Sequence, residues 1–213
     1  MTTIDARPRR AGWRRGAARC VVLILAGWLV MAGLAGWAGA AQAIEFDALM
    51  AMLAQTRSGQ ARFTEQRWVS GLDAPLASSG TLSFTAPDRF TRQMLAPRSE
   101  TLAVHGNSVS LSRNGRSRSL ARDAAPEIEP IVEALRGTLT GNGRSLQQHF
   151  KTSVSGDAQS WLLTLAPIAP RLQALLAGVR ITGQRAELRS VEMRMADGDR
   201  SLMLIEAVPE SRR

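Results

Sequence analysis

Apolar residues along this chain follow two spacings, which divide it into helical and extended segments. The first helical stripe has intervals of three, one and three residues and comprises Phe46, Leu49, Met50 and Leu53. We expect this amphipathic helix to end at Ser58-Gly59. From there to about residue 123, apolar and polar residues alternate in short runs, the pattern of strands with one buried face. The sequence therefore predicts one helix followed by an antiparallel meander.

The predicted strands of the meander are separated by clusters of Gly, Pro, Asn and Ser. They cover residues 61–69, 80–84, 89–95, 102–104 and 109–111. Pro87 and Pro97 bracket the third run, as expected of residues that cannot donate into a ladder. Asn114-Gly115 is a strong hairpin signal because both residues tolerate positive φ.

Helical spacing returns in the middle of the chain, and strands resume after it. Helices are predicted for residues 126–139 and 145–150, with a break at Gly141-Asn142-Gly143. Later strands are predicted at 151–155, 160–165, 179–182, 187–195 and 201–208, with a short helix at 170–177. Strand twist makes a large sheet curl or close. We therefore expect an α+β fold: a curved antiparallel sheet of about ten strands that forms an incomplete (half) β-barrel covered by short helices.

The N-terminal segment has the three parts of a secretory signal peptide. Six arginines precede an uncharged apolar run at 21–40, and Ala41-Gln42-Ala43 supplies the small residues of a cleavage site. We expect a signal peptide at 1–43 and a single domain at 44–213, secreted across the inner membrane. An uncleaved anchor is the alternative, because about 20 apolar residues can also span a bilayer.

Composition narrows the chemistry of the secreted domain. The only cysteine of the sequence, Cys20, lies in the predicted signal peptide. The 170 residues that remain of 213 after cleavage can therefore form no disulfide and no cysteine metal site. Those residues hold 21 Lys and Arg against 17 Asp and Glu, spread without a cluster. Such an excess is typical of a solvated surface and not of a nucleic-acid interface.

Catalytic patterns are weak. His105 and His149 lack metal-ligand spacing, no G-x-S-x-G elbow is present, and Asp197-Gly198-Asp199 is typical of a hairpin turn and not of a calcium loop. We therefore expect no enzyme activity, no metal and no cofactor.

A curled sheet with apolar inner positions either fills its concavity with its own side chains or holds an apolar ligand there. Glycines 137, 141 and 143 around the middle helices suggest a hinged cover, and methionines suit variable apolar ligands. The expected ligand-binding residues are Phe63, Leu82, Phe84, Phe90, Met94, Trp161, Leu163 and Met193.

The order and spacing of several short motifs resemble the LolA/LolB-like periplasmic lipoprotein carriers. They are Phe63-Thr64-Glu65-Gln66, Gly80-Thr81-Leu82-Ser83-Phe84, Pro87-Asp88-Arg89-Phe90, Pro97, Val104-His105-Gly106-Asn107, Leu162-Leu163-Thr164-Leu165-Ala166-Pro167 and the hairpin from Leu188 to Ile205. The similarity spans about residues 44–208, although each motif alone has low specificity.

This resemblance implies a monomeric periplasmic carrier that binds acyl chains of lipoproteins or other lipids in an apolar cavity and moves them toward the outer membrane. Its partners would be the acyl-bearing cargo, an inner-membrane donor complex and an outer-membrane acceptor. Phe90 falls where the family has an aromatic residue at the cavity. Two positions depart from the family: Ala86 replaces an arginine that helps to hold the helical lid, and Arg92 replaces a common tryptophan.

Two other functions are compatible with the same pattern. The domain could be a periplasmic sensor or interaction module whose cavity is filled by its own core, with no transported cargo. It could also be a hydrolase acting on acyl substrates, in which case His105 and His149 are the candidate bases. Binding of acyl probes separates the carrier from the first alternative, and turnover of esters tests the second.

Overall fold

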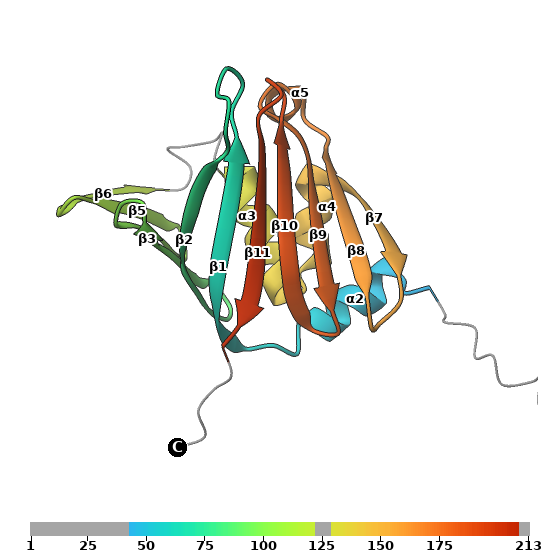
Figure 1. The fold of residues 1–213 in the computed structure, drawn as a ribbon. Helices are drawn as coiled ribbons and strands as arrows, with labels where there is room; N and C mark the ends of the chain where they lie inside the picture. Colours follow the sequence, from blue (N-terminus) through green and yellow to red (C-terminus); the bar gives the residue numbers. More distant parts are fainter. Residues whose placement is uncertain (1–42, 122–128, 209–213) are drawn as a thin grey trace, which may run out of the picture. The chain divides into compact units, whose positions relative to one another are not determined.

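The protein is described here by a computed structural model that covers residues 43–121 and 129–208. Its strands form one open antiparallel sheet in the order β6-β5-β4-β3-β2-β1-β11-β10-β9-β8-β7 (Figure 1). The strands are β1 (Ser58–Trp68), β2 (Leu76–Thr85), β3 (Arg89–Ala96), β4 (Glu100–His105), β5 (Ser108–Arg113), β6 (Arg116–Ala121), β7 (Phe150–Gly156), β8 (Trp161–Pro167), β9 (Leu176–Gln184), β10 (Glu187–Met195) and β11 (Arg200–Ala207).

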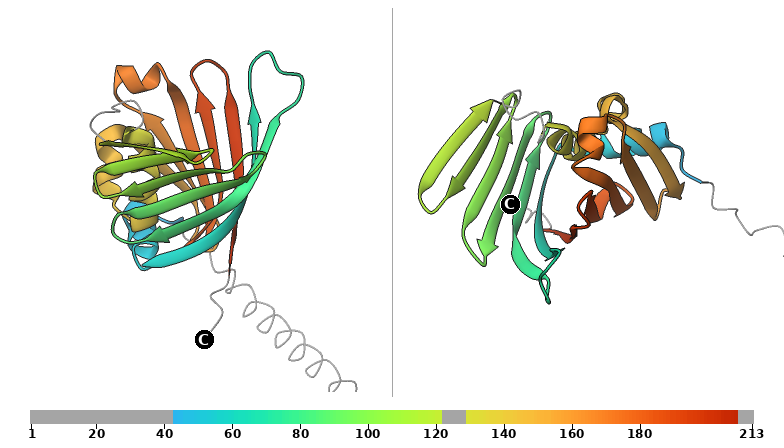
Figure 2. Two further views of the ribbon diagram at one scale, coloured as in Figure 1. Left: turned by 90° about the vertical axis from the view of Figure 1, so that its left-hand side faces the viewer. Right: turned by 90° about the horizontal axis from the view of Figure 1, so that it is seen from above.

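Every strand except β1 and β11 neighbours only strands adjacent to it in sequence. The pairing of β1 with β11 joins the first meander to the last, with Phe63 opposite Ile205 and Glu65 opposite Met203. The sheet bends along its width, so that β3–β6 and β7–β9 form two wings on either side of β1 and β11 (Figure 2). This curvature gives the sheet one concave face.

Within residues 43–121 and 129–208, four short helices lie against or beside this sheet: α2 (Phe46–Leu53), α3 (Glu129–Thr140), α4 (Gly143–His149) and α5 (Pro170–Gln173). α2, α3 and α4 lie inside the bend, toward the wing formed by β7–β9 (Figure 2). Asn142 caps α4, because its side-chain oxygen accepts a hydrogen bond from the Ser145 backbone N–H at 3.1 Å. No helix in the described ranges is long and apolar enough to cross a membrane.

The main hydrophobic core lies between these helices and one half of the sheet. It comprises Leu49, Met50, Leu53, Ala134, Leu146, Phe150, Trp161, Leu163, Leu165, Leu172, Leu176, Val179 and Ile181, all of which are buried. These residues belong to the four helices and to β7, β8 and β9. Among the described residues, strands β1 to β5 contribute no member of this cluster, so their concave side chains face a different environment.

The structure confirms the predicted fold class and corrects several boundaries. The sheet has 11 strands where about ten were expected. Ser58-Gly59 begins β1 instead of ending the first helix, and β2 starts at Leu76 instead of Gly80. The predicted helix at 170–177 is helical only from Pro170 to Gln173, because Leu176 already belongs to β9, where it pairs with Met195 of β10.

Some predictions fall outside the described residues. All of the predicted signal peptide at 1–43 except Ala43 lies in residues 1–42, as does Cys20, and the start of the predicted helix at 126–139 lies in residues 122–128. The predicted hairpin at Asn114-Gly115 is confirmed: it joins β5 to β6, and the two residues have φ values of 51° and 75°.

The glycines of the middle helices serve close packing. A Cβ on Gly137 would lie 2.8 Å from Cγ of Leu146 on α4, and one on Gly143 would lie 2.7 Å from Cε1 of Phe46 on α2. Gly141 has a φ of 65°, and a Cβ there would collide with the Met50 carbonyl oxygen. The structure therefore explains these glycines by tight helix contacts, which differs from the hinge suggested by the sequence.

Candidate ligand-binding site

A cavity of about 1050 Å³ lies against the concave face of the sheet. Its described lining comes mainly from β1 to β4 and from β9 to β11, and Ala134, Leu135 and Arg136 of α3 contribute on the helical side. The volume is at the upper end of the range of about 300–1,000 Å³ that is typical of small-molecule sites. The helices thus fill only one part of the concavity.

Strand register sets the apolar wall. Phe84 on β2 pairs with Phe90 on β3, and Phe90 pairs with Val104 on β4. All three side chains line the cavity. On the other side, Val191 on β10 pairs with both Ile181 on β9 and Met203 on β11, and these three also line it. Alternation along each strand therefore places apolar residues from six strands on one surface.

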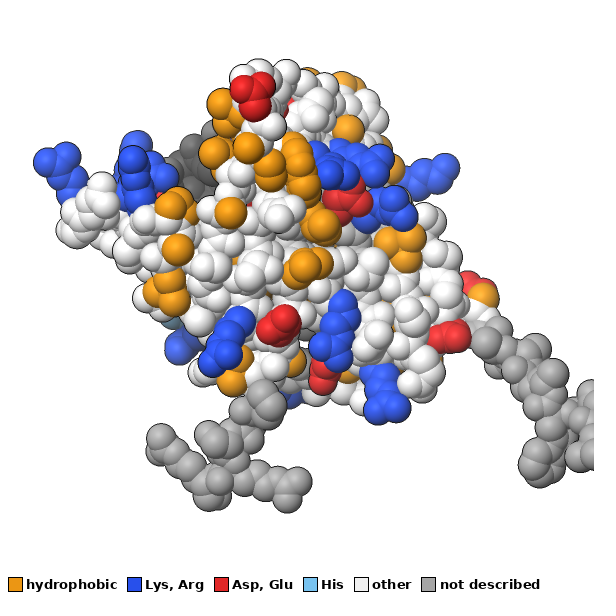
Figure 3. Space-filling view, viewed as in Figure 1, with side chains coloured by type: hydrophobic (Ala, Val, Ile, Leu, Met, Phe, Trp, Pro, Cys, Tyr) orange, Lys and Arg blue, Asp and Glu red, His pale blue; other side chains and the backbone are white. Residues whose placement is uncertain are grey.

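The cavity lies behind the sheet in the view of Figure 3, which shows the opposite face. That face carries mostly polar side chains and backbone, with arginines and some hydrophobic side chains among them (Figure 3). Leu204 and Leu95, which are about half exposed, contribute to this outer face. The two faces of the sheet therefore differ in character, as expected when only one is shielded from water.

The structure places the eight residues expected to bind ligand in two groups. Five line the cavity: Leu82, Phe84, Phe90, Met94 and Met193. Phe63, Trp161 and Leu163 lie on the same concave face but do not belong to the lining. Their side chains are at most 2% exposed, so they are packing residues in this structure.

Trp161 has a specific structural role in the helix-covered half. Its ring lies over Gly183, where a Cβ would collide with the indole. The indole Nε1–H donates a hydrogen bond to the Arg185 carbonyl oxygen at 2.8 Å. This contact satisfies the polar edge of the ring while its apolar surface joins the core.

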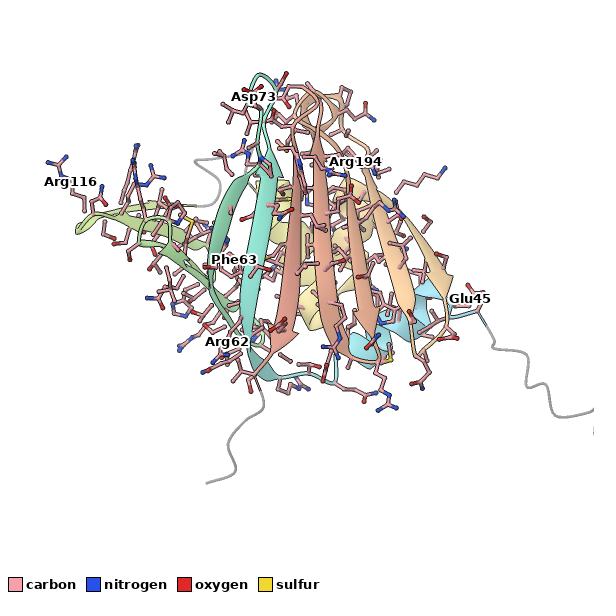
Figure 4. All side chains as sticks on the ribbon, viewed as in Figure 1. Glu45, Arg62, Phe63, Asp73, Arg116 and Arg194 are labelled. Atoms are coloured by element: carbon pink, nitrogen blue, oxygen red, sulfur yellow. The ribbon has the colours of Figure 1, made fainter. Side chains whose placement is uncertain are left out.

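Phe63 is separated from the cavity by an arginine. The guanidinium of Arg92 lies over the Phe63 ring, 4.7 Å from its centroid, and forms an ion pair with Glu65. The Arg92 and Glu65 side chains are 19% and 13% exposed, and Ser78 Oγ donates to Glu65 Oε2 at 3.2 Å. Figure 4 shows Phe63 on β1, near the middle of the sheet. This group places a charged pair among the apolar side chains of the wall.

A second charged group lies farther along β4 and β5. Arg113 Nη2 contacts Glu100 Oε2 at 2.6 Å across this strand pair, and both residues line the cavity. Arg67 on β1 also lines it, and its guanidinium lies 3.2 Å from Asp199 Oδ2 in the β10–β11 turn. One end of the cavity therefore has more charged residues than the end formed by Phe84, Phe90 and Val104, where Asp88 and Arg89 also line it.

The turn at Asp197-Gly198-Asp199 is a hairpin connection, as predicted. The Asp199 backbone N–H donates to Asp197 Oδ1 at 3.0 Å, and Gly198 has a φ of 95°. Asp199 Oδ1 accepts from the Ser70 backbone N–H at 2.9 Å, which ties the turn to the β1–β2 loop. Across the described residues, no three His, Cys, Asp or Glu side chains gather in a group that could hold a metal ion.

Sequence reasoning missed the charged residues of the cavity. Glu65 shares the concave parity of Phe63, and Arg92 shares that of Phe90 and Met94, so alternation alone places both inside. Only the register across β1, β2 and β3 shows that these two charges meet. The other lining residues not predicted include Leu102, Val104, Val179, Ile181, Val191, Met203 and Ile205.

Comparison with protein families assigns this architecture. The family described as outer membrane lipoprotein carrier protein LolA-like matches residues 38–210, about four fifths of the chain. The chain therefore belongs to this LolA-like family. A comparison with curated protein sequences gave no match.

Several solved structures match this chain at very low sequence identity and with TM-scores below 0.5. A LolA superfamily protein from Nitrosomonas europaea is 8% identical, with 79% of this chain and 96% of that chain covered and a TM-score of 0.40. A DUF1329 family protein from Desulfovibrio piger is 6% identical, with coverage of 78% and 92% and a TM-score of 0.42. A chain from the complex of the CwlD amidase with the GerS lipoprotein of Clostridioides difficile is 7% identical, with coverage of 95% and 99% and a TM-score of 0.35.

Proposed function

We propose that this protein is a periplasmic carrier that holds acyl chains of lipoproteins or other lipids in its concave cavity and moves them toward the outer membrane. Residues 1–43 direct export and are removed, and 44–213 form the working domain. An inner-membrane donor complex loads the cargo and an outer-membrane acceptor receives it. The main supporting observation is the cavity of about 1050 Å³ with its wall of apolar side chains from six strands.

Binding of this kind draws on the hydrophobic effect. Burial of an acyl chain is favourable by about 0.8 kcal/mol for each methylene group removed from water. The wall contains Met94, Met193 and Met203, whose flexible side chains can adapt to chains of different length. Because the interaction is non-directional, a carrier with such a wall accepts several acyl cargoes and releases them to a better-matched acceptor.

Displacement of a fluorescent fatty acid tests this proposal. The whole chain is expressed in a bacterial host, the exported protein is purified, and extracted lipids are identified by mass spectrometry. We expect co-purifying acyl lipid and saturable probe binding. Phe90→Glu is expected to weaken probe binding at least tenfold, because it places a carboxylate in the apolar wall at the register position shared with Phe84 and Val104.

Leu95→Glu is the matched control. It makes the same change of side-chain type on the same strand, but Leu95 is 56% exposed and lies on the outer face. We expect the control to bind the probe as the unchanged protein does, and circular dichroism establishes that both variants are folded. Absence of lipid and of probe binding in the unchanged, folded protein would overturn the carrier function and favour the interaction module.

A further inference from the structure

The cavity wall carries more positive than negative side chains. Its described lining includes six arginines, Arg67, Arg89, Arg92, Arg98, Arg113 and Arg136, against three acids, Glu65, Asp88 and Glu100. A carrier for purely neutral acyl groups gains nothing from such an excess, because each guanidinium near an apolar wall loses part of its hydration. The charge balance therefore carries information about the cargo.

These arginines differ in their partners. Arg92 pairs with Glu65, Arg113 with Glu100, and Arg67 with Asp199. Within the described ranges, Arg89 and Arg98 have no carboxylate within 4.0 Å and no hydrogen bond to another side chain, and of these two only Arg98 lies near Glu100 and Arg113. The Arg98 guanidinium is therefore available to an anion that enters from solvent.

Arg98 lies at the polar end of the cavity. It belongs to the segment between β3 and β4, directly after Pro97 and two residues before Glu100, and all three line the cavity. Arg113 lies opposite Glu100 in the β4–β5 ladder, and its side chain is 59% exposed. The exposed Arg98 and Arg113 therefore place two guanidinium groups that water can reach at the polar end of the cavity, and Phe84, Phe90 and Val104 line the other end.

We propose that the preferred occupant is an acyl chain that ends in an anionic group, a carboxylate or a phosphate. The chain lies along the apolar wall, and the anion is held at the polar end by Arg98 with support from Arg113. Guanidinium groups bind both anions through paired, charge-assisted hydrogen bonds. This inference rests on the proposed carrier function and adds the chemical class of the cargo.

The test compares ligands that share one chain and differ in their head. Dodecanoate, dodecyl phosphate, methyl dodecanoate and dodecylammonium compete with the fluorescent fatty acid, and inorganic phosphate is the probe without a chain. We expect one or both anionic amphiphiles to compete about tenfold better than the methyl ester at low ionic strength, and this advantage to shrink as salt is added. A comparison of dodecanoate with dodecyl phosphate shows which head group is preferred. Inorganic phosphate is expected not to compete.

Arg98→Gln tests the residue, and Arg62→Gln is the control with the same change in net charge. Arg62 is exposed on the outer face of β1 (Figure 4). We expect Arg98→Gln to remove most of the preference for the anionic amphiphile and to leave methyl dodecanoate binding unchanged. Arg62→Gln is expected to change neither.

Two results would overturn the proposal that the preferred cargo is anionic. One is equal competition by dodecanoate, dodecyl phosphate and methyl dodecanoate, which leaves the carrier function standing and removes the role of the head group. The other is an equal loss in both arginine variants, which reports net charge and not a site. If none of the amphiphiles competes and the probe itself does not bind, the carrier function and the anionic cargo fail together.

Discussion

Arg92 shows how one residue changes the surface that a cavity presents. The LolA-like pattern favours a tryptophan here, which would extend the aromatic wall from Phe90. In this chain the guanidinium instead covers Phe63 and pairs with Glu65, which Ser78 also contacts. The pair is largely shielded from water, so each charge depends on the other for its compensation.

Removal of one member of this pair should destabilise the protein. Glu65→Met leaves the Arg92 guanidinium over Phe63 without its carboxylate, and we expect a loss of about 1–3 kcal/mol in the free energy of unfolding. This range lies between exposed and fully buried pairs because the two side chains are 19% and 13% exposed. Urea denaturation followed by tryptophan fluorescence measures the change.

Two further variants test whether that loss comes from an unpaired charge. Glu187→Met breaks the exposed pair with Arg189, and we expect it to change stability by less than about 0.5 kcal/mol. The double variant Glu65→Met with Arg92→Leu removes both charges and should recover much of the loss, since an apolar pair suits this wall. A double variant less stable than Glu65→Met contradicts the explanation by an unpaired charge.

The sequence predicts only in part which inward-facing residues line the cavity. Alternation places Phe63, Phe90, Trp161 and Met193 on the concave face, as the structure shows. It does not say where the helices lie, and the helices decide that Trp161 is covered while Met193 remains at the cavity. Pairwise contacts such as Arg92 over Phe63 depend on register across three strands, which no local pattern contains.

Among the elements, the helical group depends on glycine at its closest approaches. Gly141 ends α3 with a φ of 65°, and its N–H donates to the Thr138 carbonyl oxygen at 3.3 Å. Its Cα faces the end of α2, where the Met50 carbonyl oxygen leaves no space for a Cβ. Two constraints, one of conformation and one of space, therefore apply to the same residue.

Gly141→Ala and Gly115→Ala separate these two constraints. Both residues have positive φ, but the structure shows nothing within 4 Å of a Cβ on Gly115. We expect Gly115→Ala to lower the free energy of unfolding by about 1 kcal/mol from backbone strain alone. Gly141→Ala should lower it by about 2–4 kcal/mol, because α2 must also move away. Equal losses in thermal or urea unfolding contradict the packing role of Gly141.

The elements themselves were more predictable than their ends. Period-two alternation located every strand in the two meanders apart from β6, which the hairpin signal implies. The start of β2 was missed because Ser78 and Ser79 have low strand propensity, and pairing with β1 holds them extended. Leu176 was assigned to a helix for a similar reason: its strand conformation comes from pairing with β10.

At the scale of the whole sheet, the two wings differ in what packs on them. The buried cluster joins β7, β8 and β9 to the helices, whereas the concave side of β2 to β5 borders the cavity. Arg116 marks the far end of the wing β3–β6, at the β5–β6 hairpin (Figure 4). In the proposed carrier, the wing β7–β9 would hold the fold while the wing β3–β6 would adjust to the cargo.

Amide hydrogen exchange should report this difference between the wings. We expect amides of β8 and β9 to exchange slowest, because both strands are paired on two sides and their inner side chains Leu163, Leu165 and Ile181 are at most 1% exposed. Amides of β5 should exchange at least tenfold faster, since local opening there disrupts little of the buried cluster. Mass spectrometry of peptides from 108–113 and 161–167 measures β5 and β8 in one sample, and Asn114-Gly115 supplies a rapidly exchanging reference. Equal protection of the two peptides would mean that the sheet opens as one unit. Any adjustment of the cavity to cargo would then come from α3 and not from the wing β3–β6.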